Sequence, residues 1–97
     1  MYGTVARLKL KPGMQAKLEE EMRQYERLKV PGFVGTTIYR MDRDENEFYM
    51  AVAFEDKQSY VANAGDPKQD ERYRAMRALL EADPEWHDGE IVWSQKI

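Results

Sequence analysis

The sequence predicts an α+β fold in which helices cover one face of an antiparallel sheet. Segments whose polarity alternates every two residues are interspersed with segments whose apolar residues recur every three or four positions. Their order along the chain is strand, helix, strand, strand, helix, strand. The third strand segment, Glu47 to Glu55, is apolar on both faces. At 97 residues the chain has the length of one domain, which we expect to span residues 1–97.

The first half of the chain is expected to hold a strand, a helix and a second strand. Tyr2 to Leu10 is a strand by its alternation, with Arg7 and Lys9 on the polar face. Met14 to Lys29 is a helix, because apolar residues recur there at helical spacing. Pro31 and Gly32 end that helix. The next strand, Phe33 to Met41, is rich in Thr, Ile and Tyr, which favour strands.

The second half begins with a polar hairpin turn and the third strand. A short helix is expected after Asp56, which can cap it, and a longer one after Asp66, with Pro67 at its first position. The expected bounds are Asp42 to Asn46 for the turn, Glu47 to Glu55 for the strand, Lys57 to Ala64 and Pro67 to Glu81 for the helices, Ala82 to Gly89 for a loop, and Glu90 to Ile97 for the last strand.

This order predicts a ferredoxin-like sheet, a split βαβ arrangement with the helices on one face. The third strand turns Phe48, Met50, Val52 and Phe54 to one side and Tyr49, Ala51 and Ala53 to the other. A chain this short cannot cover both sides of the sheet by itself. We therefore expect a second copy of the chain to cover the bare face, which gives a homodimer.

Composition excludes several classes of function. The chain has no cysteine, which removes disulfides, thiolate nucleophiles and cysteine metal sites. Its net charge of -3 argues against a nucleic-acid surface, since the basic residues are interleaved with acids. No apolar run has the length of a membrane span, and the start of the chain lacks the pattern of a secretion signal. We expect a cytoplasmic protein that binds neither membranes nor nucleic acids.

Short motifs along nearly the whole chain resemble those of a known family. They are Lys11-Pro12-Gly13, Pro31-Gly32-Phe33, Phe54-Glu55-Asp56 followed by Tyr60, Asn63-Ala64-Gly65-Asp66-Pro67, and Trp86-His87-Asp88-Gly89. The sequence resembles the antibiotic biosynthesis monooxygenase-like domains of the dimeric α/β-barrel superfamily. The resemblance implies a ligand cavity between the sheet and the helices of each subunit. It also implies cofactor-free oxidation of electron-rich phenols, in which the deprotonated substrate itself reduces oxygen.

The resemblance also implies positions for site residues. Quinone-forming members carry an Asn within the third strand, a Trp at its end and a Tyr on the following helix. Tyr60 matches the Tyr, whereas Met50 stands in place of the Asn and Phe54 in place of the Trp. Haem-degrading members need an axial histidine on the second long helix, and Pro67 to Leu80 contains none. We therefore expect no cofactor.

Three residues are candidate catalytic groups: Tyr60, His87 and Arg40. Six are candidate contacts to a small hydrophobic or aromatic ligand: Tyr39, Met50, Phe54, Asn63, Tyr73 and Trp86. Tyrosine offers a polar group in an apolar wall, and histidine can transfer protons near neutral pH. No metal site is expected, because a lone histidine lacks a second ligand at metal-binding spacing.

Each candidate has a structural alternative. His87 fits an exposed loop residue, and Arg40 or Arg7 a partner of an acid such as Glu47. Tyr60 and Tyr73 could be ordinary core residues, and Asn63 a turn residue beside Gly65. Two functions follow. The first is a cofactor-independent monooxygenase acting on a small aromatic or polyketide-like substrate. The second is a non-catalytic dimeric module that binds a small hydrophobic ligand, or a stress-related structural domain.

Overall fold

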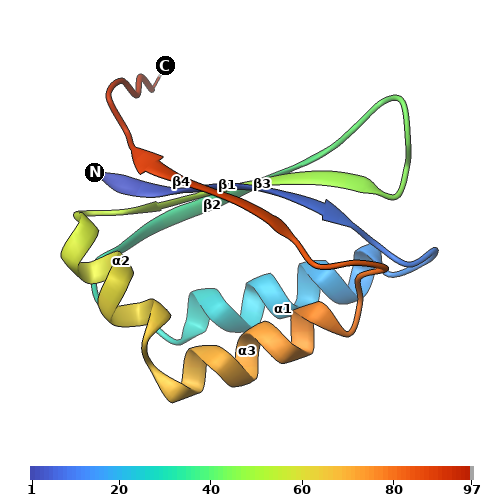
Figure 1. Ribbon diagram of the computed structural model, residues 1–97, viewed down its shortest axis with the longest axis horizontal. Helices are drawn as coiled ribbons and strands as arrows, with labels where there is room; N and C mark the ends of the chain where they lie inside the picture. The colour runs from blue at the N-terminus through green and yellow to red at the C-terminus, as the bar shows by residue number, and fades with distance from the viewer. Residues whose placement is uncertain (97) are drawn as a thin grey trace.

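The computed structural model describes residues 1–96 and shows one sheet with all the helices on one side (Figure 1). The elements are β1 (Tyr2–Lys9), α1 (Gln15–Arg27), β2 (Phe33–Arg40), β3 (Glu47–Phe54), α2 (Lys57–Ala64), α3 (Pro67–Arg77) and β4 (Glu85–Glu90). Among the described residues, no helix is both long and apolar enough to cross a membrane.

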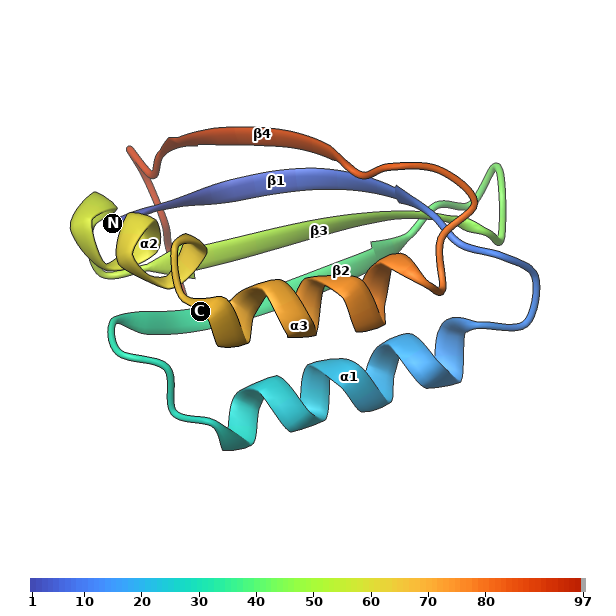
Figure 2. The ribbon, with the colours of Figure 1, turned by 60° about the horizontal axis from the view of Figure 1, so that its bottom comes forward.

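The strands lie in the order β2-β3-β1-β4, and each neighbouring pair is antiparallel. The connection from β1 through α1 to β2 therefore passes over β3, which is the split βαβ arrangement that the sequence predicts. Figure 2 shows α1 and α3 side by side beneath the sheet, with α2 at one end. The predicted ferredoxin-like α+β fold is confirmed.

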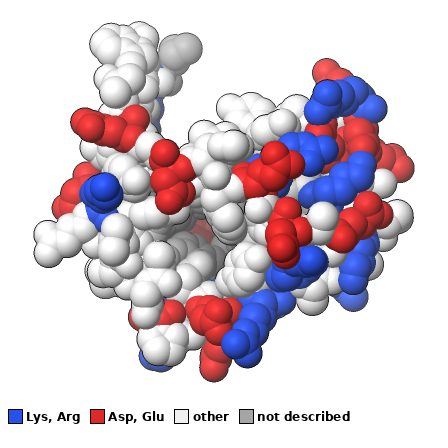
Figure 3. Space-filling model, in the orientation of Figure 1, with Lys and Arg blue, Asp and Glu red and all other residues white. Residues whose placement is uncertain are grey.

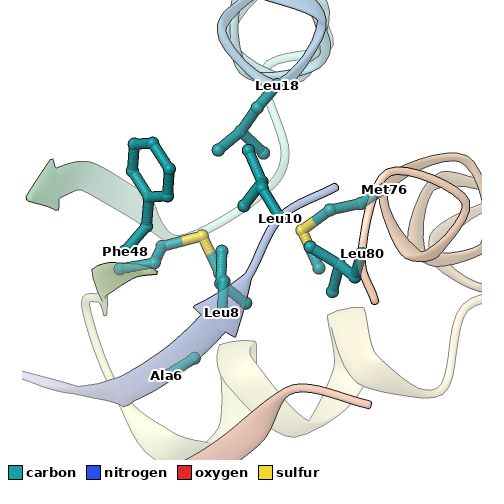
Figure 4. Packing of buried hydrophobic residues seen from close by; sticks show 8 residues of the cluster. Ala6, Leu8, Leu10, Leu18, Phe48, Met76 and Leu80 are labelled. Atoms are coloured by element: carbon teal, nitrogen blue, oxygen red, sulfur yellow. The ribbon is translucent and has the colours of Figure 1, made fainter. Parts of the chain in front are cut away.

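The core lies between the sheet and the two longer helices. Ala6, Leu8 and Leu10 face the helices from β1 and its extension, and Leu18 of α1 points toward Leu10 (Figure 4). Met76 and Leu80 complete the cluster from the side of α3. The predicted alternation of β1 is confirmed, since Arg7 and Lys9 are only half-buried on the opposite face. Fully buried leucines of this kind each contribute about 2–5 kcal/mol by comparison with alanine.

Local chemistry fixes the helix starts near the cavity. The Asp56 Oδ1 atom accepts a hydrogen bond from the Ser59 backbone N–H at 2.7 Å, so it caps α2. Asp66 caps α3 in the same way, accepting from the N–H of Lys68 at 2.8 Å. Gly32 has a φ of +78° and packs directly against Ser59, which leaves no room for a side chain. These contacts hold α2 over the end of the sheet.

The prediction for the last strand was wrong. Residues 85–90 form β4, where a loop was expected, and residues 91–96 are not in a strand; Ile97 lies outside the described residues. Every residue of β4 is exposed, so its burial does not alternate, and only backbone pairing with β1 defines it. Val92 and Trp93 are correspondingly exposed, at 87% and 78%. The second long helix also ends earlier than predicted, at Arg77.

The sheet face opposite the helices carries both apolar residues and a charged cluster. Val5 and Tyr39 are about half exposed there, at 48% and 58%. At one end Glu47 accepts from Arg7 Nε at 2.7 Å and from Arg43 Nε at 2.6 Å. These two guanidinium groups lower the pKa of Glu47 to about 2. Arg7 thus pairs with Glu47, which confirms the structural alternative given for this arginine.

Candidate functional site

A cavity of about 510 Å³ lies between the helices and the inner face of the sheet. Figure 3 shows a hollow on this side of the molecule, surrounded largely by uncharged atoms. Its apolar walls come from Met22 of α1, Met50 and Val52 of β3, Met76 of α3 and Trp86 of β4. Concave apolar cavities with a few inward polar groups are the usual form of small-molecule sites.

A chain of five aromatic rings includes three that line the cavity, Tyr25, Phe54 and Tyr60. Tyr25, Phe33, Phe54, Tyr60 and Tyr2 follow one another with centroid distances of 5.0, 5.6, 5.6 and 5.3 Å, all edge to face. Such contacts contribute about 0.5–1.5 kcal/mol per pair beyond the burial of apolar area. The rings of Phe54 and Tyr60 are therefore held in place from both sides.

The first polar group of the cavity joins α2 to β4. The Tyr60 hydroxyl donates a hydrogen bond to Asp88 Oδ1 at 2.8 Å. Burial, and then the Asp88 carboxylate, raise the pKa of Tyr60 to about 12 against a smaller opposing effect of Thr4, so its phenol stays protonated at neutral pH. Thr4 lies opposite Asp88 in the β1–β4 register. Its Oγ1 atom is buried and forms no hydrogen bond of normal geometry among residues 1–96.

The second polar group joins α1, α2 and α3. Asn63 Nδ2 donates to the Tyr25 hydroxyl at 3.1 Å, while Asn63 Oδ1 accepts from Arg72 Nη2 at 3.3 Å. Arg72 Nε donates to Gln69 Oε1 at 3.0 Å. Burial raises the pKa of Tyr25, and the nearby charge of Arg72 opposes that shift. All four residues line the cavity.

The structure brings most of the predicted site residues to the cavity. Its lining includes Tyr60, Met50, Phe54, Asn63, Tyr73 and Trp86. The Tyr73 and Trp86 rings lie beside each other in the cavity wall, with centroids 6.4 Å apart. These six residues line the cavity, and their roles in binding or catalysis stay predictions.

Three predicted site residues lie elsewhere. Side chains alternate along a strand, so Trp86 and Asp88 point into the cavity and His87 points to the opposite face, where it is exposed. Tyr39 also lies on that outer face, paired with Tyr49 of β3. Arg40, at the end of β2, donates from Nη1 to Gln15 Oε1 at 3.2 Å and does not line the cavity.

Four further residues line the cavity that were not predicted from the sequence: Thr4, Asp88, Tyr25 and Arg72. Thr4 shares a strand face with Leu8 and Leu10, and Tyr25 shares the apolar face of its helix with Leu18 and Met22. The residue pattern therefore indicates that both side chains point inward. Asp88 was assigned to a loop, where it has no defined direction. Arg72 gave no signal, because a single arginine on a helix is ordinarily exposed. Within residues 1–96, no three His, Asp or Glu side chains are grouped so that they could hold a metal ion.

Comparison with known proteins agrees with this architecture. The antibiotic biosynthesis monooxygenase family pattern matches residues 1–68. A mutant of SnoaB, a cofactor-independent oxygenase from Streptomyces nogalater, superposes with a TM-score of 0.80 at 19% identity, over 96% of this chain and 94% of that one. No curated protein sequence matched the chain.

Two further crystal structures have the same fold at low identity. A protein assigned as an antibiotic biosynthesis monooxygenase from Bordetella bronchiseptica gives a TM-score of 0.79 at 17% identity, covering 95% of this chain and 97% of that one. One of the same description from Chloroflexus aurantiacus gives 0.76 at 20% identity, covering 99% and 97%. Since the family pattern covers more than half of the sequence, the chain belongs to the antibiotic biosynthesis monooxygenase family.

Proposed function

We propose that the protein is a cofactor-independent monooxygenase that acts on a small aromatic or polyketide-like substrate. Family membership supports the reaction type, and SnoaB, of similar fold, is itself described as a cofactor-independent oxygenase. The observation that carries the proposal is the Tyr60–Asp88 hydrogen bond in the cavity. It lies beside the buried Thr4 hydroxyl, which has no hydrogen-bond partner among residues 1–96. The apolar walls would hold aromatic rings, and the polar group would face the reacting carbon.

The proposed reaction begins with removal of a proton from the substrate. Asp88 is the one carboxylate in the cavity that contacts Tyr60, and it accepts that proton while Tyr60 orients the substrate oxygen. The resulting electron-rich anion gives one electron to oxygen, and the two radicals combine to form a carbon–oxygen bond. The peroxide anion takes back the proton held by Asp88, and the resulting hydroperoxide loses water, so a CH₂ group and O₂ become a carbonyl group and H₂O.

Two hydroxyl groups are placed to stabilise the negative charge that develops on oxygen. The Thr4 hydroxyl is a buried donor with no protein acceptor among the described residues. Tyr60 keeps its proton because its pKa is raised to about 12. In the resting protein this single O–H is donated to Asp88; once Asp88 has taken the substrate proton, the hydroxyl can turn to the developing anion. Donors that are already fixed in position stabilise such charge more than freely reorienting water does. In this proposal Thr4 and Asp88 are the catalytic groups beside Tyr60, in place of the predicted His87 and Arg40.

The proposal is tested with a panel of anthrones and hydroquinones under oxygen, following quinone absorbance and oxygen consumption together. We expect at least one substrate to turn over above the heat-inactivated control. Tyr60→Phe should slow that turnover, whereas Tyr39→Phe, a matched change on the outer face, should not. Absence of turnover across the panel, or equal rates for both variants, would contradict the proposal.

One observation favours a non-catalytic ligand-binding module as the second candidate. Met50 and Phe54 face the cavity where the resemblance implies an Asn and a Trp, and neither can form a normal hydrogen bond. A binding module would bind aromatic ligands, with calorimetric heat or tryptophan quenching, but would consume no oxygen with any of them.

We also propose that the protein is a homodimer that pairs through the outer face of the sheet. Helices cover only the other face, and Val5 and Tyr39 stay largely exposed on the outer one. On β3 the small residue Ala51 pairs with Val5, and Ala53 pairs with Gly3, which allows a flat approach over this part of the face. Burial of this face against a second copy would remove its apolar area from water.

A further inference from the structure

Arg72 is held in the cavity without being neutralised. Most arginines of the chain contact a carboxylate within 4.0 Å: Arg7, Arg23, Arg43, Arg74 and Arg77. Among residues 1–96, Arg72 forms no such pair, although it is half-buried and lines the cavity. Arg27 and Arg40 also have no carboxylate partner there, but both are exposed to water. A partly buried cation without a counter-charge is costly, so its retention calls for a physical reason.

Neutral groups orient the guanidinium plane. Its Nε and Nη2 atoms donate to the amide oxygens of Gln69 and Asn63, and its carbon lies 5.2 Å from the centre of the Tyr25 ring. Amides and an aromatic face fix the position of the cation but leave its full charge in place. A guanidinium has five N–H groups, and only these two bonds to protein acceptors occur in the described part of the chain.

The acidic residues of the same cavity are engaged elsewhere or too distant. Asp70 pairs with Arg74 at 2.9 Å. Asp88 accepts from Tyr60 at 2.8 Å. Glu21 of α1 lines the cavity but does not come within 4.0 Å of Arg72. The positive charge of Arg72 is therefore available to a ligand.

We propose that Arg72 anchors an anionic group, a carboxylate, on the aromatic molecule that occupies this cavity. A guanidinium binds a carboxylate through two parallel N–H···O bonds, which gives both strength and direction. Tyr73 and Trp86 form the adjoining aromatic wall for the ring that bears the acid. This inference rests on the proposed function in one respect, because it assumes that this cavity is the substrate site. The substrate class becomes aromatic acids.

The test uses two probes, β-naphthoate and its methyl ester, titrated into the protein by isothermal titration calorimetry. They share the ring and differ in the charge. Neither has a hydroxyl group to oxidise, so the result does not depend on oxygenase activity. We expect the acid to bind at least about tenfold more tightly than the ester, because a charge-assisted hydrogen bond is lost in the ester. Added salt should weaken binding of the acid and leave that of the ester unchanged.

Substitutions of Arg72 test whether this side chain causes the preference for the acid over the ester. Arg72→Gln should bring the two affinities together, and Arg72→Lys, which keeps the charge, should retain part of the difference. Arg27→Gln is the matched control: it removes the same charge from an exposed position in the last turn of α1 and should retain the whole difference. Thermal unfolding of each variant shows whether it folds. If Arg72→Gln does not fold, the Lys variant and the salt dependence decide.

Three results would overturn the inference: equal affinity for the acid and the ester, a preference that survives in Arg72→Gln, or no binding of either probe. The outcome separates this inference from the oxygenase proposal. Acid preference without turnover of any anthrone or hydroquinone retains the anion site and rejects the oxygenase. Turnover without acid preference rejects only the anion site.

Discussion

Replacing Asp88 by asparagine separates two contributions of this residue to catalysis: accepting a proton and holding Tyr60 in position. The introduced amide would keep an oxygen at the place where Asp88 Oδ1 accepts from the Tyr60 hydroxyl at 2.8 Å. The hydrogen bond and the fold should therefore persist, with stability within about 1 kcal/mol of wild type. A neutral amide cannot accept a proton, and positioned acid–base groups contribute about 100-fold to 10,000-fold to rates. We expect kcat to fall by that factor.

The same substitution has a spectroscopic consequence that a merely structural role would not produce. The pKa of Tyr60 is raised to about 12 by burial first and by the Asp88 carboxylate second. Removal of that charge should lower the Tyr60 pKa, while burial keeps it above the ordinary value of about 10. Absorbance titration of the tyrosinate, compared with Tyr60→Phe to identify the transition, measures this change.

The kinetic assay is oxygen consumption with the best anthrone from the panel, at saturating substrate. Asp42→Asn is the control, because Asp42 is exposed in the turn between β2 and β3, outside the cavity. A kcat of Asp88→Asn within about twofold of wild type would refute the role of Asp88 as proton acceptor, since base catalysis contributes far more than that.

The remaining predictions concern stability and assembly. Because Glu47 has a folded-state pKa of about 2, below its ordinary 4.5, its contribution to stability is complete above pH 4.5 and is lost as the pH falls toward 2; acid unfolding of Glu47→Gln should lack this component, and an unchanged acid limb would contradict it. Leu18→Ala should lower the free energy of unfolding by about 2–5 kcal/mol in urea titration, whereas the exposed Leu28→Ala should cost far less. Gly32→Ala should destabilise by about 1 kcal/mol or more, because its φ is +78° and Ser59 occupies the space of a Cβ; wild-type stability would refute that reasoning. Sedimentation should show a dimer that Val5→Asp dissociates, and a wild-type monomer of 11.4 kDa at micromolar concentration would contradict the proposed interface.

Residue patterns predicted β1, β3 and the two longer helices because each of them buries residues on one face. The strand β2 and the helix α2 contain no fully buried residue and were predicted from strand propensity and capping. Leu8 and Leu10 alternate with Arg7 and Lys9, and the structure buries the leucines and leaves the charged residues half-exposed. Asp56 was predicted correctly as a helix cap, and the start of the next helix after Asp66 was also correct, since capping depends only on neighbouring backbone N–H groups. Local chemistry and one-sided burial thus specify most of this fold.

The last strand and part of the site could not be predicted in the same way. β4 is an edge strand of mostly polar, exposed residues, and its hydrogen bonds to β1 are the main basis of its structure. Missing that strand hid the direction of its side chains, so His87 was placed in the site and Asp88 was not. Arg72 enters the cavity through amide partners on two helices, a tertiary arrangement that no spacing along the chain records.

Isotope labelling tests the central claim, that this cavity oxygenates its substrate without a cofactor, most directly. The protein is treated with a chelator, freed of small molecules by gel filtration, and supplied with an anthrone under heavy oxygen gas. We predict that each quinone molecule carries one labelled oxygen atom, that the other appears in water, and that Asp88→Asn slows the incorporation. Unlabelled quinone, or labelling at the rate of the heat-inactivated protein, would contradict the account.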